Sequence, residues 1–471
     1  MPESFPLSIM ESYFIHNALI VNEGKQFPGS LIIKDGRIEE IFNGPGPQSF
    51  SLPSGIVEID AGGQLLIPGV IDDHVHFRDP GLTEKGDLYT ESRAAVAGGV
   101  TSFMDMPNTL PKATSLEILE EKYRLAAKKS LANFSFFLGA ANDNLDEIKK
   151  ADPSRICGLK VFTGASTGNM LVSDPAALEA IFRESPLLIA VHSEDEAIIQ
   201  ANLKTYIERY GEDIPIEAHP LIRSEEACYK SSELLVNLAL KHKARLHLLH
   251  LSTAKELGLL DNTIPLGSKR ITGEVCVHHL WFDDRDYADL GSRIKWNPAI
   301  KTEKDKLGLM EGLISDKIDI IATDHAPHLL KEKDHPYTSC PSGAPLIQHC
   351  LVAMLGFYHM GKLSIETIVD KMCHSPAVLY RIRERGFIRK GYSADLVMVA
   401  LDAPWTVATE NILYKCGWSP FEGVTFRSRV NMTWVNGHLV FDHGKFNESL
   451  KGNRLSFNHS VNQSCSQSVN I

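Results

Sequence analysis

His74 and His76 stand one residue apart in the stretch VIDDHVHFRDPG, which begins at Val70. Successive side chains of a strand point to opposite faces, so these two imidazoles point the same way. Two converging imidazoles form either a hydrogen-bonded pair or half of a metal site. A single His-x-His pattern does not decide between these two alternatives. The other polar residues of the chain have to decide.

Further residues with metal or acid–base chemistry follow apolar runs of strand length. They are His192 in LLIAVHSE, His250 in ARLHLLHLS, and Asp324 in IDIIATDHAP. Taken singly, either histidine is more often a structural residue bonded to backbone, and the aspartate could cap a helix. Their repetition at the ends of runs favours one shared site.

Lys160 interrupts the apolar run GLKVF. A lysine inside an apolar strand is costly unless it is paired or chemically altered. It is therefore either an ion-paired residue near a rim or an N-carboxylated lysine, whose carbamate oxygens bridge two cations.

The second alternative predicts a binuclear zinc site, because zinc binds both imidazole and carboxylate oxygen. Two Zn²⁺ ions per subunit would share carboxylated Lys160 and a hydroxide, and would lower the pKa of that water. The expected ligands are His74 and His76 for one ion, and His192 and His250 for the other. Asp324 would ligate the first ion and shuttle a proton.

Eight apolar runs of strand length alternate with helical segments between residues 68 and 385. This alternation predicts parallel strands, and eight units predict a (β/α)8 barrel whose active site lies at the carboxyl ends of the strands. Residues 11–67 and 386–448 read as short strands and predict one composite β-sandwich domain, with a hairpin at Asn436-Gly437. The Ser- and Asn-rich tail, 449–471, predicts disorder.

Composition excludes several classes of protein. The chain has 471 residues, 43% of them hydrophobic, and a formal net charge of -11 without a basic stripe, so no nucleic-acid partner is expected. The amino-terminal stretch lacks a basic region typical of signal peptides, and no apolar run approaches the ~20 residues of a membrane helix. Eight scattered cysteines favour free thiols in a reducing compartment, so we expect a cytoplasmic protein.

The motifs DDHVHFRDPG, MDMPNT, GLKVF, VHSED, LHLLHLS and ATDHAPH together resemble the cyclic amidohydrolases, most of all the dihydroorotases of the class I type. The resemblance runs from about Ile20 to Phe446 and includes the later GFIRKGYSADLVMV and CGWSPFEG. It implies reversible hydrolysis of (S)-dihydroorotate to N-carbamoyl-L-aspartate, a step of de novo pyrimidine biosynthesis, with zinc and a carboxylated lysine.

The resemblance also implies the substrate contacts. Arg78, Asn108 and His328 match positions that hold the substrate carboxylate, and a guanidinium suits a carboxylate because it donates two charge-assisted bonds. Asn297 matches a position that contacts the pyrimidine ring, and the segment 341–346 is expected to offer backbone contacts. The alternatives are a surface ion pair for the arginine and a turn residue for the first asparagine.

Other members of the superfamily remain alternatives. Allantoinase and dihydropyrimidinase share the fold and the metals, but their substrates have no free carboxylate that would require Arg78. An inactive scaffold homologue would have lost ligands, and a mononuclear deaminase would lack Lys160. His278 and His279, in tandem on the seventh predicted strand, are left either as structural residues or as residues that support the ligands. By family habit we expect a homo-oligomer, and association with aspartate transcarbamoylase is an open question.

Overall fold

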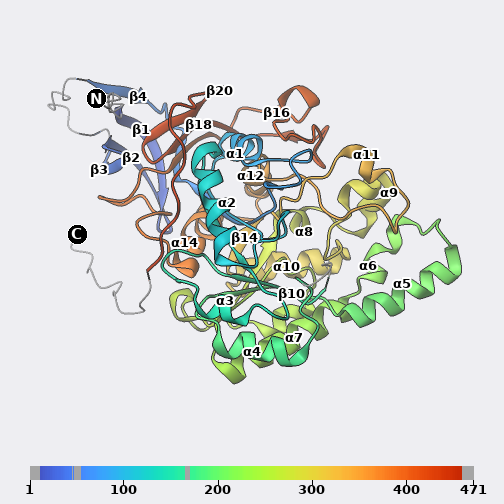
Figure 1. The fold of residues 1–471 in the computed structure, drawn as a ribbon. Coiled ribbons are helices and arrows are strands. Elements are labelled where there is room, and N and C mark those ends of the chain that lie inside the picture. Colours follow the sequence, from blue (N-terminus) through green and yellow to red (C-terminus); the bar gives the residue numbers. More distant parts are fainter. Residues whose placement is uncertain (1–10, 45, 47–54, 165–169, 459–471) are drawn as a thin grey trace, which may run out of the picture.

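Parallel strands at the centre of the molecule form a six-stranded and a three-stranded sheet, which together close into a ring. The computed structural model describes residues 11–44, 46, 55–164 and 170–458 of the chain (Figure 1). The ring strands are β6 (Val70–Val75), β7 (Val100–Asp105), β8 (Asn133–Phe136), β9 (Leu138–Gly139), β10 (Leu159–Phe162), β11 (Ile189–His192), β12 (Leu246–Leu248), β13 (Ile271–Cys276) and β14 (Ile320–Ala322). A parallel bridge from Val75 to His325 joins the last strand region to the first. The eight predicted runs and the barrel are confirmed, with β8 and β9 sharing the third run.

Helices alternate with the strands and surround them. The longer ones are α1 (Leu88–Ala97), α2 (Leu116–Lys129), α4 (Pro175–Glu184), α5 (Glu196–Tyr210), α7 (Glu225–His242), α10 (Glu303–Ile314) and α12 (Cys350–His359). Shorter ones are α3 (Leu145–Lys149), α6 (His219–Ile222), α8 (Val277–Trp281), α9 (Tyr287–Leu290), α11 (Leu330–Lys333), α13 (Ile365–Val369) and α14 (Ser375–Tyr380). Several begin at a side-chain cap: Asp195 accepts from the backbone N–H of Ile198 and so starts α5 directly after β11.

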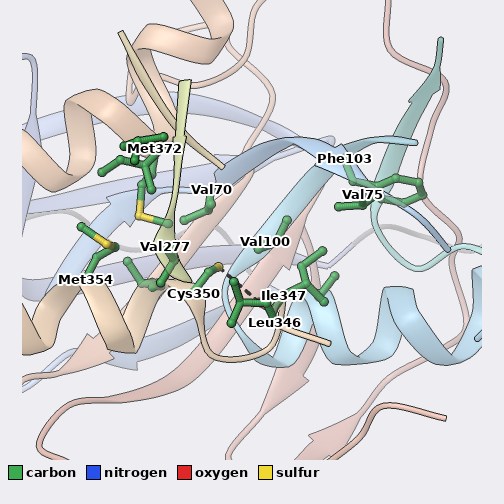
Figure 2. Packing of buried hydrophobic residues seen from close by; sticks show 14 of the residues in the cluster. Val70, Val75, Val100, Phe103, Val277, Leu346, Ile347, Cys350, Met354 and Met372 are labelled. Carbon is green, nitrogen blue, oxygen red and sulfur yellow. Dashed lines mark hydrogen bonds between the residues drawn. The ribbon is translucent and has the colours of Figure 1, made fainter. Parts of the chain in front are cut away.

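The apolar core lies between the ring strands and the helices. Strand residues such as Val70, Val100 and Phe103 pack there with residues of α12, including Cys350 and Met354 (Figure 2). These strands are buried on both faces, which is why their sequences read as continuous apolar runs.

The two ends of the chain meet in one nine-stranded sheet beside the barrel (Figure 1). Its strands are β1 (Ser12–Asn22), β2 (Lys25–Lys34), β3 (Arg37–Asn43), β4 (Ile56–Asp60), β5 (Leu65–Pro68), β15 (Leu396–Ala400), β18 (Arg429–Val435), β19 (His438–Asp442) and β20 (Lys445–Phe446). Strand β15 pairs antiparallel with β5, which joins the carboxyl-terminal strands to the amino-terminal ones. Two further short strands, β16 (Trp405–Thr406) and β17 (Thr425–Phe426), pair with each other.

The hairpin predicted at Asn436-Gly437 is confirmed. Both residues have positive φ, 52° and 77°, and Val435 pairs with His438 across the turn. Positive φ at both central positions matches the twist of the flanking strands.

The predicted disordered tail differs from the structure in its first ten residues, 449–458. Leu455 and Phe457 are buried, at 1% and 2% exposure, and Phe457 bridges to Ile382. Two apolar residues at strand spacing give this polar stretch enough burial to hold it against the barrel. The remainder of the predicted tail, 459–471, lies outside the described residues.

Two findings bear on the predictions from composition. Within the described ranges, no helix is long and apolar enough to cross a membrane. The seven cysteines in the same ranges are all free thiols.

Candidate active site

All ten residues predicted for the site line one cavity of about 210 Å³ at the carboxyl ends of the ring strands. They are His74, His76, Arg78, Asn108, Lys160, His192, His250, Asn297, Asp324 and His328. Phe162, Trp296, Ala326, Ser342 and Gly343 complete the lining. The cavity is smaller than the roughly 300–1,000 Å³ typical of drug-sized ligands, so it suits a single small ring.

Asp324 faces both histidines of the His-x-His pair. Its Oδ1 lies 3.3 Å from His74 Nε2 and 3.2 Å from His76 Nε2. On the other edge of each ring, His74 Nδ1 lies 2.6 Å from Glu274 Oε1, and His76 Nδ1 lies 2.8 Å from Asn108 Oδ1. Both oxygens accept hydrogen bonds, so each Nδ1 carries the proton and each Nε2 carries a lone pair.

This arrangement places three electron-rich atoms, two Nε2 and one Oδ1, against one another. Such a group is stable only with a cation or an additional proton among the atoms. Burial opposes the proton, since it lowers the pKa of His76 to about 4. Imidazole and carboxylate are zinc ligands, so the donor set fits a divalent cation.

Lys160 is fully buried on β10, with Nζ 4.6 Å from the centre of the Phe162 ring. Burial lowers the pKa of its ammonium to about 8, against the opposing effect of the Asp324 and Glu274 carboxylates. A substantial neutral fraction near neutral pH is what addition of carbon dioxide to an amine requires. The environment therefore fits an N-carboxylated lysine.

His192 and His250 also line the cavity, with ring centres 4.6 Å apart, and the His250 ring centre lies 5.2 Å from that of His74. His192 Nε2 lies 2.7 Å from Glu194 Oε2, so this ring presents Nδ1 as its lone-pair nitrogen. His250 Nδ1 is buried without a hydrogen-bond partner, and burial holds the pKa of the ring well below its ordinary value. Two neutral imidazoles in this setting fit a second cation.

Backbone strain concentrates at this site. Arg78, His250 and Asp324 have φ of 66°, 39° and 47°, a region that residues other than glycine rarely adopt. Each such residue costs of order 1–3 kcal/mol, and the surrounding structure must hold it in place.

Arg78 and His328 form a polar wall beside the candidate metal ligands. The Arg78 guanidinium donates from Nε to the Pro327 carbonyl, at 3.1 Å, and an Nη lies 3.1 Å from His328 Nε2. On the far side of that ring, Lys85 Nζ lies 3.2 Å from His328 Nδ1. Two of the five guanidinium N–H groups are used in these contacts. Arg78 is 8% exposed, which excludes the surface ion pair considered from sequence.

The two asparagines differ in what they can offer. Asn108 accepts from His76 through Oδ1, which leaves the two N–H groups of its amide for a ligand. Asn297 has a buried Oδ1 without a hydrogen-bond partner. In the segment 341–346, the backbone N–H and carbonyl of Gly343 are bonded to Lys295 and Lys333, so Ser342 is the residue of that segment free to offer backbone contacts from the lining.

Sequence reasoning missed the carboxylates behind the histidines. Glu274 on β13 accepts from His74 Nδ1 and from the backbone N–H of His250, at 2.6 and 2.9 Å. Glu194 holds His192 and is itself held by the Arg223 guanidinium. A carboxylate inside the apolar run ITGEVC is as unusual as Lys160, and that signal could have identified Glu274.

One placement from the sequence is wrong. His278 and His279 lie in the short helix α8 and not on the seventh strand. Strand β13 ends at Cys276, and the chain turns into the helix at the next residue. An apolar run cannot by itself separate a strand from a buried helix that follows it.

With the fold and the site described, comparison with known proteins defines the class. The model of the amidohydrolase family matches residues 65–440, and the chain belongs to that family.

Particular relatives narrow the class. The dihydroorotase of Methanothermobacter thermautotrophicus is 32% identical over 95% of this chain and 96% of its own length. The dihydroorotase of Anaplasma phagocytophilum is 31% identical over 90% of this chain and 94% of its own. Among solved structures, the L-hydantoinase (dihydropyrimidinase) of Arthrobacter aurescens is similar with a TM-score of 0.89 at 26% identity, covering 95% of this chain and all of that one.

Proposed function

We propose that this protein is a dihydroorotase, which hydrolyses (S)-dihydroorotate reversibly to N-carbamoyl-L-aspartate. One observation carries the proposal: a buried guanidinium, Arg78, shares a small cavity with a cluster of metal-ligand residues. The cluster suits hydrolysis of an amide, and the guanidinium suits a substrate with a carboxylate. The relatives named dihydroorotase, similar over nearly the whole chain, support the same activity.

The amidohydrolase family is metal-dependent, and the donor atoms of His74, His76 and Asp324 lie close enough together to hold a cation. The proposed cofactor is a pair of zinc ions. His74, His76 and Asp324 would hold one ion, His192 and His250 the other, and N-carboxylated Lys160 would bind both. When bound, the ions supply Lewis acidity and a water of lowered pKa.

Asp324 is the proposed general base and acid. Its carboxylate takes a proton from the attacking water and gives it to the ring nitrogen as the amide C–N bond breaks. That nitrogen becomes the terminal NH₂ of the carbamoyl group, and the former carbonyl carbon becomes a carboxyl group. The new carboxyl ionises and releases a proton, so acidic conditions favour ring closure.

The Arg78 wall orients the substrate. The guanidinium, the amide N–H groups of Asn108 and the ring of His328 would bind the substrate carboxylate, while Asn297 and Ser342 would contact the ring. Fixing the carboxylate places the ring amide against Asp324 and the metal-ligand residues, which lowers the entropic cost of reaction.

The competing function is that of a hydantoinase or dihydropyrimidinase, which the structural similarity to the Arthrobacter aurescens enzyme favours. Hydantoin and dihydrouracil have no carboxylate. Such an enzyme would gain nothing from a buried cation at this wall, which would cost free energy when left unpaired.

The test compares hydrolysis of L-dihydroorotate, dihydrouracil, hydantoin and allantoin by the zinc-loaded protein, with wild type and Arg78→Ala in parallel. We expect turnover of dihydroorotate, largely lost in the variant. Turnover of a substrate without a carboxylate, unaffected by the substitution, would support a cyclic amide hydrolase but refute its assignment as a dihydroorotase. The homo-oligomer stays a prediction, and association with aspartate transcarbamoylase stays an open question.

A further inference from the structure

A second group of metal-ligand side chains lies outside the residues that line the cavity. Cys276 is the last residue of β13, and His278 and His279 belong to the first turn of α8. One ligand atom from each of the three lies within 4.8 Å of the others. All three side chains are buried, at 0%, 0% and 3% exposure.

The histidines of this group have unpartnered ring nitrogens. Neither ring nitrogen of His278 is within hydrogen-bond geometry of a partner, although the Thr323 backbone lies near enough to favour the protonated ring. Nδ1 of His279 also has no partner. His279 Nε2 lies 3.2 Å from the Pro298 carbonyl oxygen, which can only accept, so Nε2 carries the proton and Nδ1 carries a lone pair. Leaving a buried polar group without a partner is unfavourable, and this group has several such nitrogens.

Aromatic packing explains the position of the His278 ring but not why its nitrogens lack hydrogen-bond partners. The His278 ring stacks on Trp296 with centres 4.0 Å apart and planes 5° from parallel. Stacking uses the face of a ring and leaves the nitrogens on its edge without partners. A phenylalanine or leucine at this position would pack without that cost.

We propose that Cys276 Sγ, a ring nitrogen of His278 and His279 Nδ1 bind a divalent cation of the zinc class, separate from the two ions of the cavity. Thiolate and imidazole together suit zinc, and a water would complete four-coordination. In a tetrahedral site the ligand atoms lie about 3.5 Å apart, so the side chains must approach by about 1 Å. The thiol proton leaves to solvent when the ion binds.

Glu274 is not a member of this site, although its Oε1 lies 3.8 Å from Cys276 Sγ. Its two oxygens already accept from His74, His247 and the backbone of His250. Binding an ion there would break the bond that orients His74. The histidines of α8 have no such competing bonds, so they are the better ligands.

Cobalt(II) tests this site independently of the proposed activity. A thiolate bound to Co²⁺ gives a charge-transfer band in the near ultraviolet, and the ligands proposed for the cavity include no sulfur. We expect the band in cobalt-loaded wild type and its loss in Cys276→Ser, together with one equivalent of bound metal. The matched control is Cys373→Ser, which changes another buried thiol and should retain both.

The visible bands of cobalt at the nitrogen and oxygen ligands of the cavity report that each variant is folded and loaded. Wild type that shows these bands without the near-ultraviolet band overturns the proposal. A band that persists in Cys276→Ser overturns it as well, since another thiol would then be the ligand. If Cys276→Ser does not fold, His279→Gln retains the sulfur and should bind this cobalt at least 10-fold more weakly. An unchanged cobalt affinity in His279→Gln would refute the role proposed for the histidines of α8 as ligands.

Discussion

Glu274 contacts both the candidate metal site, through His74, and the buried residue His247. Its Oε1 accepts from His74 Nδ1 at 2.6 Å and from the His250 backbone N–H at 2.9 Å. Its Oε2 lies 3.3 Å from His247 Nε2. Changing Glu274 to Gln preserves the shape and removes the negative charge. The amide also places an N–H₂ where one of these donors now points.

The expected magnitudes follow from those contacts. A hydrogen bond to a charged group contributes about 1.5–3 kcal/mol and a neutral one about 0.5–1.5, so each of the two ring contacts loses about 1 kcal/mol. The free energy of unfolding should therefore fall by about 2 kcal/mol. Zinc affinity should fall by about 10–100-fold, because the carboxylate fixes the tautomer and raises the basicity of the ligand histidine.

The assay measures zinc affinity by competition with a chromophoric chelator, and unfolding in urea for the metal-free protein. Glu256→Gln is the matched control. Glu256 is also a buried carboxylate, 2% exposed, but it accepts from Ser232 and Thr253 and touches no ligand histidine. The control should leave zinc affinity unchanged.

Equal zinc affinity for wild type and Glu274→Gln would refute this reasoning. It would show that the His74 ring is held by packing alone. An equal loss in both variants would assign the effect to general destabilisation.

Three further changes test other parts of the structure. Burial lowers the pKa of His247, but hydrogen bonds and charge from Asp73 and Glu274 outweigh burial and raise this pKa from 6.5 to about 9. The stability that the charged His247 ring contributes is therefore complete below pH 6.5 and is lost as the pH rises through 9. The difference in urea unfolding between wild type and His247→Gln should shrink over that range, and a constant difference would contradict the charge. Arg223→Met leaves Glu194 buried without its cation and should cost about 3–5 kcal/mol in the same measurement, whereas a loss below about 1 would refute the pairing. Phe457→Ala should lower Tm by several degrees through loss of its buried ring, and an unchanged Tm would contradict the seating of that segment.

The barrel is predictable from sequence for a physical reason. Parallel strands buried on both faces must be continuous apolar runs, and eight such runs separated by helices leave few other architectures. The site is predictable because polar residues at strand ends, such as His192 and Asp324, converge at one end of any such barrel. The sequence therefore predicts the end of the barrel at which these residues lie, but not the distances between them.

Residues that act through others were harder to predict. Glu274 contacts His74, which is 200 positions away in the chain, and the two meet only because the ring of strands closes. Glu194 contacts His192, which is only 2 positions away. The turn after Cys276 was missed because strand and helix form one apolar run there. Phe457 was missed because two apolar residues in a polar tail carry little pattern, although they suffice for docking.

The central claim is that Arg78 binds a carboxylate of the substrate. The most direct test measures kcat/KM for L-dihydroorotate and for its carboxamide analogue, with wild type and Arg78→Gln. Loss of two charge-assisted bonds, about 1.5–3 kcal/mol each, predicts at least a ~100-fold fall for dihydroorotate in the variant and little change for the carboxamide. Equal falls for both substrates would contradict the account, because Arg78 would then support the site without contacting the carboxylate.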